Sequence, residues 1–330
     1  MLLPRRAVLL SLAALGASAC AGLGKAAAPG PAGPDEVVPL WPAGVPGGVP
    51  AGLTEHIVYR DNPFGLLDRA AHDVTAPSLS VFRPARPDGS AILIIPGGGY
   101  KWVVIDKEGF EGARHFSARG AVVYVLRYRL PHQGWAAGAD APLQDAQRAV
   151  RVIRSRAAAD GADPARVLVM GFSAGGHLAG MLAARYREPV YDAVDAAEAL
   201  PARPDAAALI YPVVTMTRPF AHEGSRLCLI GADPPPEQVA AHGVENRVHA
   251  GMPPVFLMHA QDDPAVPVDN TLLLHAALRT AGCETAMHLF ETGGHGFGLR
   301  GIAGTPREVW PDLIAGWGRE QGLFPAGAPD

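Results

Sequence analysis

A serine of this chain lies in a glycine-rich turn of the kind that presents a nucleophile. It belongs to the string Gly171-Phe172-Ser173-Ala174-Gly175, which follows an apolar run over residues 167–170 and leads into a helical stretch over residues 174–186. In a strand-to-helix turn of this G-x-S-x-G form, small neighbours let the chain pass close by, and strained backbone geometry lifts the serine hydroxyl clear of the sheet. We therefore take Ser173 as the candidate nucleophile of an acyl transfer.

A serine hydroxyl is a weak nucleophile until a base takes its proton. In folds built around such a turn, an acid and then a histidine follow the serine along the chain, each at the end of a later strand. His295 meets this requirement, because it stands between glycines just after the apolar run over residues 287–290. His295 is therefore the candidate base.

The acid that would orient this base has two candidates, Asp262 and Asp263, which follow the apolar run over residues 255–258. We favour Asp263, because the D-x-x-V-P spacing over residues 263–267 is the usual arrangement around such an acid. Asp262 is then expected to hold the loop by hydrogen bonding to backbone amides.

A tetrahedral intermediate also needs amide donors aimed at its oxyanion. The glycine loop Pro96-Gly97-Gly98-Gly99-Tyr100 follows the apolar run over residues 91–95, and glycines let backbone N–H groups approach an oxygen without side-chain obstruction. We expect Gly98 and Gly99 to form the oxyanion hole together with Ala174, the residue after the nucleophile.

Short apolar runs alternate with helical stretches of mixed polarity through most of the chain. From the third run onward most are continuously apolar, which is typical of strands buried on both faces of a mainly parallel sheet. The pattern predicts a three-layer α/β fold with an eight-stranded sheet flanked by helices. The expected strands are residues 57–59, 79–82, 91–95, 122–126, 167–170, 207–211, 255–258 and 287–290, and the expected helices are residues 108–119, 143–159, 174–186, 268–281 and 306–321.

The chain is expected to hold one catalytic domain over residues 53–324, with a short tail over residues 325–330. Residues 20–52 are dominated by Ala, Pro and Gly and are expected to form a linker or an extended surface segment. Residues 1–19 have the basic, apolar and small-residue regions of a secretory signal peptide. We therefore expect an exported protein, either soluble in the periplasm or anchored to a membrane through a lipid on Cys20. The adjacent arginines before the apolar run leave both the general and the twin-arginine export routes open.

The composition argues against a disordered chain, a nucleic-acid-binding protein and a metalloprotein. Hydrophobic residues make up 48% and charged residues 18% of the 330 residues, which excludes a disordered chain. The net charge of −4 and the scattered Lys and Arg residues give no footprint for nucleic acid. There is no C-x-x-C or H-E-x-x-H spacing, so no metal or other cofactor is expected. Of the three cysteines, Cys228 and Cys283 are expected to be separate buried thiols rather than a disulfide.

With these residues placed, the chain resembles the bacterial acetyl esterases of the α/β-hydrolase superfamily, and in particular acetylxylan-esterase-like members related to the hormone-sensitive-lipase-like branch. One departure is Pro96, which stands where the lipase branch has a histidine before its glycines. The resemblance runs from Leu40-Trp41-Pro42 onward and includes residues 96–100, Lys107-Glu108-Gly109, residues 127–130, residues 140–145, residues 171–178 and residues 295–299.

This resemblance implies an α/β-hydrolase fold and two-step acyl transfer through Ser173, His295 and Asp263. The expected substrate is a short acyl ester, above all an acetyl ester, of a carbohydrate such as an acetylated xylan oligosaccharide. A broad carboxylesterase or a feruloyl esterase is the alternative enzyme, and an exported binding protein on a hydrolase scaffold is the alternative from another class. The side chains of Tyr100, Trp102 and Trp135 are candidates to line the mouth of the site.

Several other polar residues are expected to be structural. His177 follows the nucleophile on its helix and is expected to pack or cap, and His259 to satisfy local backbone groups. Three arginines, Arg148, Arg151 and Arg154, recur at helical spacing and are expected to form a solvated face.

Overall fold

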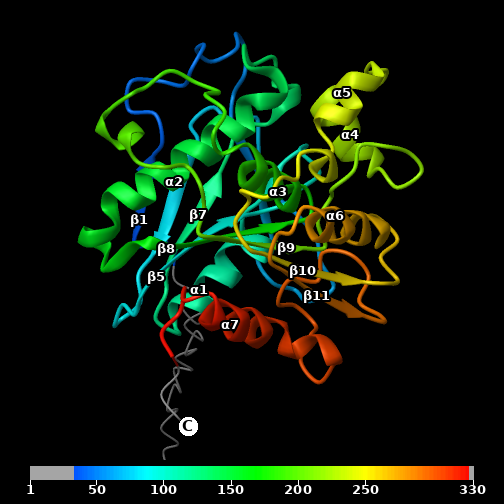
Figure 1. The fold of residues 1–330 in the computed structure, drawn as a ribbon. Coiled ribbons are helices and arrows are strands. Elements are labelled where there is room, and N and C mark those ends of the chain that lie inside the picture. Colours follow the sequence, from blue (N-terminus) through cyan, green and yellow to red (C-terminus); the bar gives the residue numbers. More distant parts are fainter. Residues whose placement is uncertain (1–32, 327–330) are drawn as a thin grey trace, which may run out of the picture. The chain divides into compact units, whose positions relative to one another are not determined.

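The computed structural model describes residues 33–326 (Figure 1). The expected signal peptide over residues 1–19, the Cys20 position, the first part of the expected linker and the last four residues of the tail lie outside the described residues. Within the described part of the chain, no helix combines the length and the apolar character needed to cross a membrane.

The central element is a sheet of eight strands, and β4 alone runs opposite to the other seven. This arrangement confirms the three-layer α/β-hydrolase fold with a mainly parallel eight-stranded sheet. In spatial order the strands are β1 (Glu36–Pro39), β4 (Ser78–Phe82), β7 (Val122–Arg127), β5 (Gly89–Ile95), β8 (Ala162–Phe172), β9 (Ala206–Ile210), β10 (Val255–Ala260) and β11 (Thr285–Phe290).

Helices cover both faces of this sheet. One face packs against α2 (Ala141–Asp160), α3 (Ala174–Arg185) and α6 (Asp269–Thr280), and the other against α1 (Glu111–Ser117) and α7 (Trp310–Glu320) (Figure 1). Successive residues of β5 point to opposite faces. Leu93 belongs to the hydrophobic core on the side of α2, α3 and α6, which we call the first core, and Ile94 to the second core, on the side of α1 and α7. Because both faces are buried, the central strands are continuously apolar, which is why the sequence pattern located them.

The eighth strand of the main sheet is not the one expected. Residues 57–59 do form a strand, β2 (His56–Tyr59), but it belongs to a separate antiparallel sheet with β3 (Arg69–His72) and β6 (Val103–Val104). The main sheet is completed instead by β1, which pairs with β4.

The folded domain therefore begins before Leu53, inside the segment expected to be a linker. Leu40 and Trp41 are buried in the first core, and the compact unit already includes Pro34. We did not predict a strand in this segment because it is rich in Pro and Gly. An edge strand tolerates proline, since it needs hydrogen bonds along one side only.

The other helices differ from expectation mainly at their ends. The expected helix over residues 108–119 is a π-helical turn (Asp106–Phe110) followed by α1, and the one over residues 306–321 is a 3₁₀ turn (Pro306–Val309) followed by α7. Two short helices, α4 (Glu223–Ile230) and α5 (Pro236–Ala241), were not expected. The remaining 3₁₀ turns are Pro131–Gln133, Gly138–Asp140, Ala196–Ala199 and Val244–Asn246.

The three arginines of α2 do not form a solvated face, so that expectation was wrong. Arg148 is only 3% exposed and pairs with Asp195 and Glu198, while Arg154 pairs with Asp205. Arg151 donates to the carbonyl oxygen of Leu200. The segment over residues 195–205 lies across this face of α2, and the arginines fasten it there.

A fully buried ion pair joins the segment after β7 to α2, and Trp41 of the N-terminal segment binds to it. Arg129 and Asp145 both have 0% exposed side chains, and Nη2 of the arginine lies 2.9 Å from Oδ1 of the aspartate. Asp145 also accepts a hydrogen bond of 2.7 Å from the indole of Trp41. The guanidinium lies over the rings of Trp41 and Trp135. Every charge in this cluster is therefore compensated, as burial requires.

Asp145→Ala is expected to lower the free energy of unfolding by about 3–5 kcal/mol, because it leaves the Arg129 charge buried without its partner. Urea unfolding followed by circular dichroism measures the change. Arg218→Gln serves as the control, since Arg218 and Glu223 form an exposed pair and their separation should leave the midpoint unchanged. Equal midpoints for Asp145→Ala and the wild type would contradict this role of the pair.

Candidate active site

Ser173 occupies the strained turn that the sequence predicts. It connects β8 to α3 with φ of 52° and ψ of −120°, a region that residues other than glycine rarely enter. The flanking glycines make the turn possible. A Cβ atom on Gly171 would lie 2.7 Å from Cβ of Ala179, and one on Gly175 would collide with the backbone of Ile95 and Pro96.

The three expected side chains of a catalytic triad meet at this turn. Ser173 Oγ lies 2.8 Å from Nε2 of His295, and Nδ1 of His295 lies 2.6 Å from Oδ2 of Asp263. Burial alone would raise the pKa of Asp263, but hydrogen bonds from His259 and His295 hold that pKa well below its ordinary value. The carboxylate therefore stays ionised and can orient the imidazole and stabilise its charged form.

The two neighbouring aspartates, Asp262 and Asp263, make different contacts. Asp262 accepts a hydrogen bond of 2.8 Å from the backbone N–H of Gly294 and so holds the loop that carries the histidine. Asp263 faces His295 with Oδ2, while its Oδ1 accepts from the backbone N–H groups of Ala265 and Val266.

His259 does more than satisfy backbone groups. Its Nε2 lies 3.0 Å from the carbonyl oxygen of Val266, as expected, but also 3.2 Å from Oδ2 of Asp263. The hydroxyl of Thr271 lies 2.8 Å from its Nδ1. His259 therefore contacts the same carboxylate oxygen as His295 and supports the candidate acid, a role that was not predicted from the sequence.

The glycine loop after β5 approaches the nucleophile closely. A Cβ atom on Gly97 would lie 2.7 Å from the carbonyl oxygen of Phe172 and 2.9 Å from Cβ of Ser173. The N–H of Gly97 is already used, because it donates to Oε2 of Glu108 over 3.0 Å. Gly98 and Gly99, with φ of 128° and 65°, line the cavity in front of the serine and remain the candidate oxyanion donors of this loop.

Ala174 also stands where an oxyanion donor is needed. It is the first residue of α3, so its N–H has no acceptor within the helix. The positive end of this helix favours negative charge at the same place.

Glu108 connects the two loops that flank the serine. This carboxylate is 4% exposed; Oε2 accepts from Gly97, and Oε1 accepts from the hydroxyl of Tyr211 over 3.1 Å. The Tyr211 oxygen in turn accepts from the N–H of Gly298, and its ring packs edge-on against His295. The Lys107-Glu108-Gly109 motif marked this position in the sequence, but nothing in the motif indicated a contact with the glycine loop.

A cavity of about 700 Å³ opens in front of Ser173 and His295. Trp102 lines it as expected, together with side chains from the segment before α4 and from α4 itself that the sequence did not single out. The lining residues are Arg60, Gly98, Gly99, Lys101, Trp102, Val104, Lys107, Glu108, His132, Ser173, His222, Gly224, Leu227, Cys228, His295 and Gly296.

Tyr100 and Trp135 do not line this cavity, so their expected contact with substrate was wrong. Tyr100 is 1% exposed, and its hydroxyl lies 2.8 Å from Nδ1 of His177. Its positive φ of 58° sets the turn that ends the glycine loop. Trp135 packs in the core against the guanidinium of Arg129.

His177 is structural, as expected. Its Nε2 donates to the carbonyl oxygen of His242, and burial lowers its pKa to about 4. The cysteines also follow the favoured interpretation in being unpaired, although Cys228 and Cys283 are partly rather than fully buried. Among residues 33–326, no group of three or more His, Cys, Asp or Glu side chains is placed to hold a metal ion.

The model of the BD-FAE family matches residues 79–278 of this chain. Among curated proteins, an acetylxylan esterase of Xylanibacter ruminicola is 31% identical over 222 residues, which are 66% of this chain and 43% of that protein. An endo-1,4-beta-xylanase B of Butyrivibrio fibrisolvens is 36% identical over 205 residues, which are 62% of this chain and 32% of that protein. The chain thus matches less than half the length of either relative.

Solved structures share the fold over more of their length. An acetyl ester-xyloside bifunctional hydrolase of Caldicellulosiruptor lactoaceticus aligns with a TM-score of 0.71 and 32% identity, covering 88% of this chain and 97% of that one. The esterase Est2 of Thermogutta terrifontis aligns with a TM-score of 0.61 and 26% identity, covering 78% of this chain and 91% of that one.

Glu108→Ala is expected to lower kcat about a hundredfold with little change in KM, because small displacements of positioned groups reduce the rate more than they reduce binding. Hydrolysis of p-nitrophenyl acetate provides the measurement. Glu108→Gln is the matched control: it keeps an oxygen for the N–H of Gly97 and should retain most of the rate. An unchanged kcat in Glu108→Ala would show that the two loops hold their positions without this carboxylate.

Proposed function

Because this chain belongs to the BD-FAE family, we propose that it is a serine esterase that removes acetyl and other short acyl groups from carbohydrate esters, such as acetylated xylan oligosaccharides. The observation that carries the proposal is the hydrogen-bonded series Ser173, His295 and Asp263 at the edge of a cavity. This arrangement is the one that activates a serine for attack on a carbonyl group.

In the proposed reaction, Ser173 Oγ attacks the ester carbonyl while Nε2 of His295 takes its proton. The carbonyl oxygen becomes an oxyanion, which the N–H groups of Gly98, Gly99 and Ala174 stabilise. The sugar alcohol then leaves with the proton from His295, and an acyl-enzyme remains. Water repeats the sequence, so that the acid is released and the serine is restored.

Two relatives support the carbohydrate part of the proposal: the acetylxylan esterase of X. ruminicola and the acetyl ester-xyloside bifunctional hydrolase of C. lactoaceticus. We propose no xylanase activity, because the chain matches only 32% of the B. fibrisolvens relative. The geometry around Ser173 suits acyl transfer, so we propose that the chain cleaves ester bonds and not glycosidic bonds.

Ser173→Ala is expected to lower acetate release from acetylated xylo-oligosaccharides by about 10⁴–10⁶-fold, as loss of the nucleophile does in serine hydrolases. Acetate is measured with the intact chain and the variant side by side, and circular dichroism confirms that both are folded. Substantial acetate release by the variant would exclude Ser173 as the nucleophile.

One observation favours a broader carboxylesterase as the second candidate. The cavity of about 700 Å³ is larger than an acetyl group requires, and Trp102, Val104 and Leu227 give it apolar walls. Such a cavity has the size and lining that admit larger ligands. The same experiment separates the two candidates. A chain that cleaves p-nitrophenyl esters but releases no acetate from the oligosaccharides would be the broader enzyme.

Export forms a separate part of the proposal, supported by the basic, apolar and small-residue order of residues 5–20. We expect the mature chain to begin at Cys20, because Ala17-Ser18-Ala19 fits a cleavage site directly before it. Mass spectrometry of the protein produced in a bacterial host measures the processed mass, and an added lipid mass would mark an anchored form. Recovery of only the full-length chain would contradict export by this signal.

A further inference from the structure

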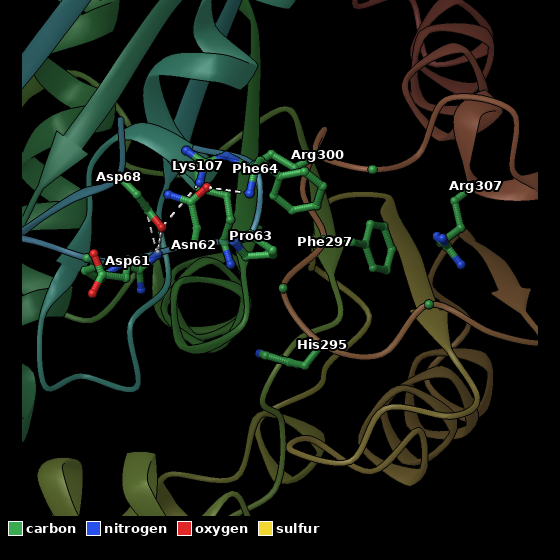
Figure 2. A pocket seen from close by; sticks show the side chains of 14 residues that line it. Asp61, Asn62, Pro63, Phe64, Asp68, Lys107, His295, Phe297, Arg300 and Arg307 are labelled. Carbon is green, nitrogen blue, oxygen red and sulfur yellow. Dashed lines mark hydrogen bonds and ion pairs between the residues drawn. The ribbon is translucent and has the colours of Figure 1, made fainter. Parts of the chain in front are cut away.

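A second cavity, of about 540 Å³, lies next to the serine cavity (Figure 2). Four residues line both spaces, namely Arg60, Lys107, His295 and Gly296. The second cavity is therefore separated from the nucleophile only by the histidine of the triad and its neighbours. In Figure 2, Lys107 and the segment over residues 61–64 lie on one side of this space, with His295 and Phe297 across from them.

The chemistry of the proposed reaction decides which part of a substrate faces this second cavity. The leaving alcohol takes its proton from Nε2 of His295, so the alcohol oxygen must lie beside that atom. In a carbohydrate ester the alcohol is the sugar. Because the second cavity begins at His295, it is placed to receive sugar units that extend from the acylated one.

The cations around this cavity are not all neutralised. Arg60 forms a two-fold hydrogen bond with Asp68, and Arg300 pairs with both Glu111 and Asp68. Lys107 is different. The residue is half-buried, and its ammonium has no ion-pair or hydrogen-bond partner among residues 33–326. It lies beside Gly296, where an added Cβ atom would be 3.2 Å from Nζ.

A second cation, Arg307, reinforces the positive charge of the wall. It donates to the carbonyl oxygen of Thr292 and lies over the ring of Phe297, but it forms no ion pair within the described residues. Asp61 is the one lining carboxylate without a cationic partner in that part of the chain, and it is exposed. Lys107 and Arg307 together outweigh it, so the cavity favours an anion.

The rim also offers an apolar surface. Phe64 lines the cavity with a side chain that is 51% exposed, while Asn62 is occupied in holding the same loop through hydrogen bonds to Phe64 and Leu66. An exposed aromatic ring beside unpaired cations suits a ligand that has both an apolar face and a negative charge, such as the ring of an acidic sugar.

We propose that this second cavity is a subsite for a uronic acid unit of the carbohydrate substrate, whose carboxylate pairs with the ammonium of Lys107. The inference rests on the proposed esterase function and names the substrate class more closely. Arg307 strengthens the positive field, and Phe64 packs against the sugar ring. Acetyl groups close to an acidic branch are therefore the preferred targets.

The experiment uses acetylated xylo-oligosaccharides that carry a glucuronic acid branch, and the same compounds with that carboxylate converted to an amide. The readout is the ratio of kcat/KM for the acidic form to that for the amide form, which cancels any difference in folding or active fraction. For the wild type we expect a ratio of about five, the effect of a partly exposed ion pair, and a decline of this ratio at high salt. Lys107→Met should reduce the ratio to about one, and Lys107→Arg should restore most of it.

Arg279→Gln is the matched control, since it removes one exposed positive charge from α6, away from either cavity, and should leave the ratio unchanged. A wild-type ratio near one, with acetate released from both forms, would overturn the subsite while the proposed function stands. A raised ratio that survives in Lys107→Met would overturn it too, because another group would then bind the carboxylate. Absence of acetate from both forms would overturn the proposed function and the subsite with it.

Discussion

The strained backbone conformation of Ser173 is the constraint on which the rest of the structure depends. A φ of 52° in a residue other than glycine costs about 1–3 kcal/mol, and such strain persists only where its surroundings enforce it. Here the enforcement comes from two buried elements, because the turn joins the long central strand β8 to the wholly buried helix α3. Gly171 and Gly175 complete the fit, since side chains at either position would collide with the neighbouring chain. The serine hydroxyl is thus set before any substrate arrives.

Glu108 holds the loops on both sides of this turn in place. Its carboxylate takes the N–H of Gly97 on one side and the hydroxyl of Tyr211 on the other, and Tyr211 holds Gly298 beyond the histidine. The loop of the candidate oxyanion donors and the loop of the candidate base therefore depend on one buried group. On the far side of His295, Asp263 is itself held by His259 and by two backbone amides. The candidate base and the candidate acid are thus each supported by another side chain, Tyr211 and His259 respectively.

Features set by local sequence could be predicted, whereas features set by distant packing could not. The central strands are buried on both faces, so their apolar runs revealed them, and Ser173, Asp263 and His295 followed from their positions at strand ends. Strand β1 escaped notice because its partner β4 lies about forty residues away and its own segment is rich in Pro and Gly. Tyr100 and Arg148 look like surface residues in the sequence, yet His177 and the segment around Asp195 bury them. The contribution of α4 to the cavity also depends on packing between distant segments. It could not be predicted, because no sequence motif indicates which segment will lie over a site.

The unpaired thiol of Cys228 has a consequence for chemical labelling. It lines the same cavity as Ser173, and burial raises its pKa, so it is mainly protonated and slow to react at neutral pH. A small alkylating or mercurial reagent that does reach it would fill part of the space in front of Ser173 without modifying Ser173, His295 or Asp263. Inactivation by such a reagent would then mimic the behaviour of a cysteine hydrolase. Only a reagent that discriminates between oxygen and sulfur nucleophiles can identify the reacting atom by inhibition.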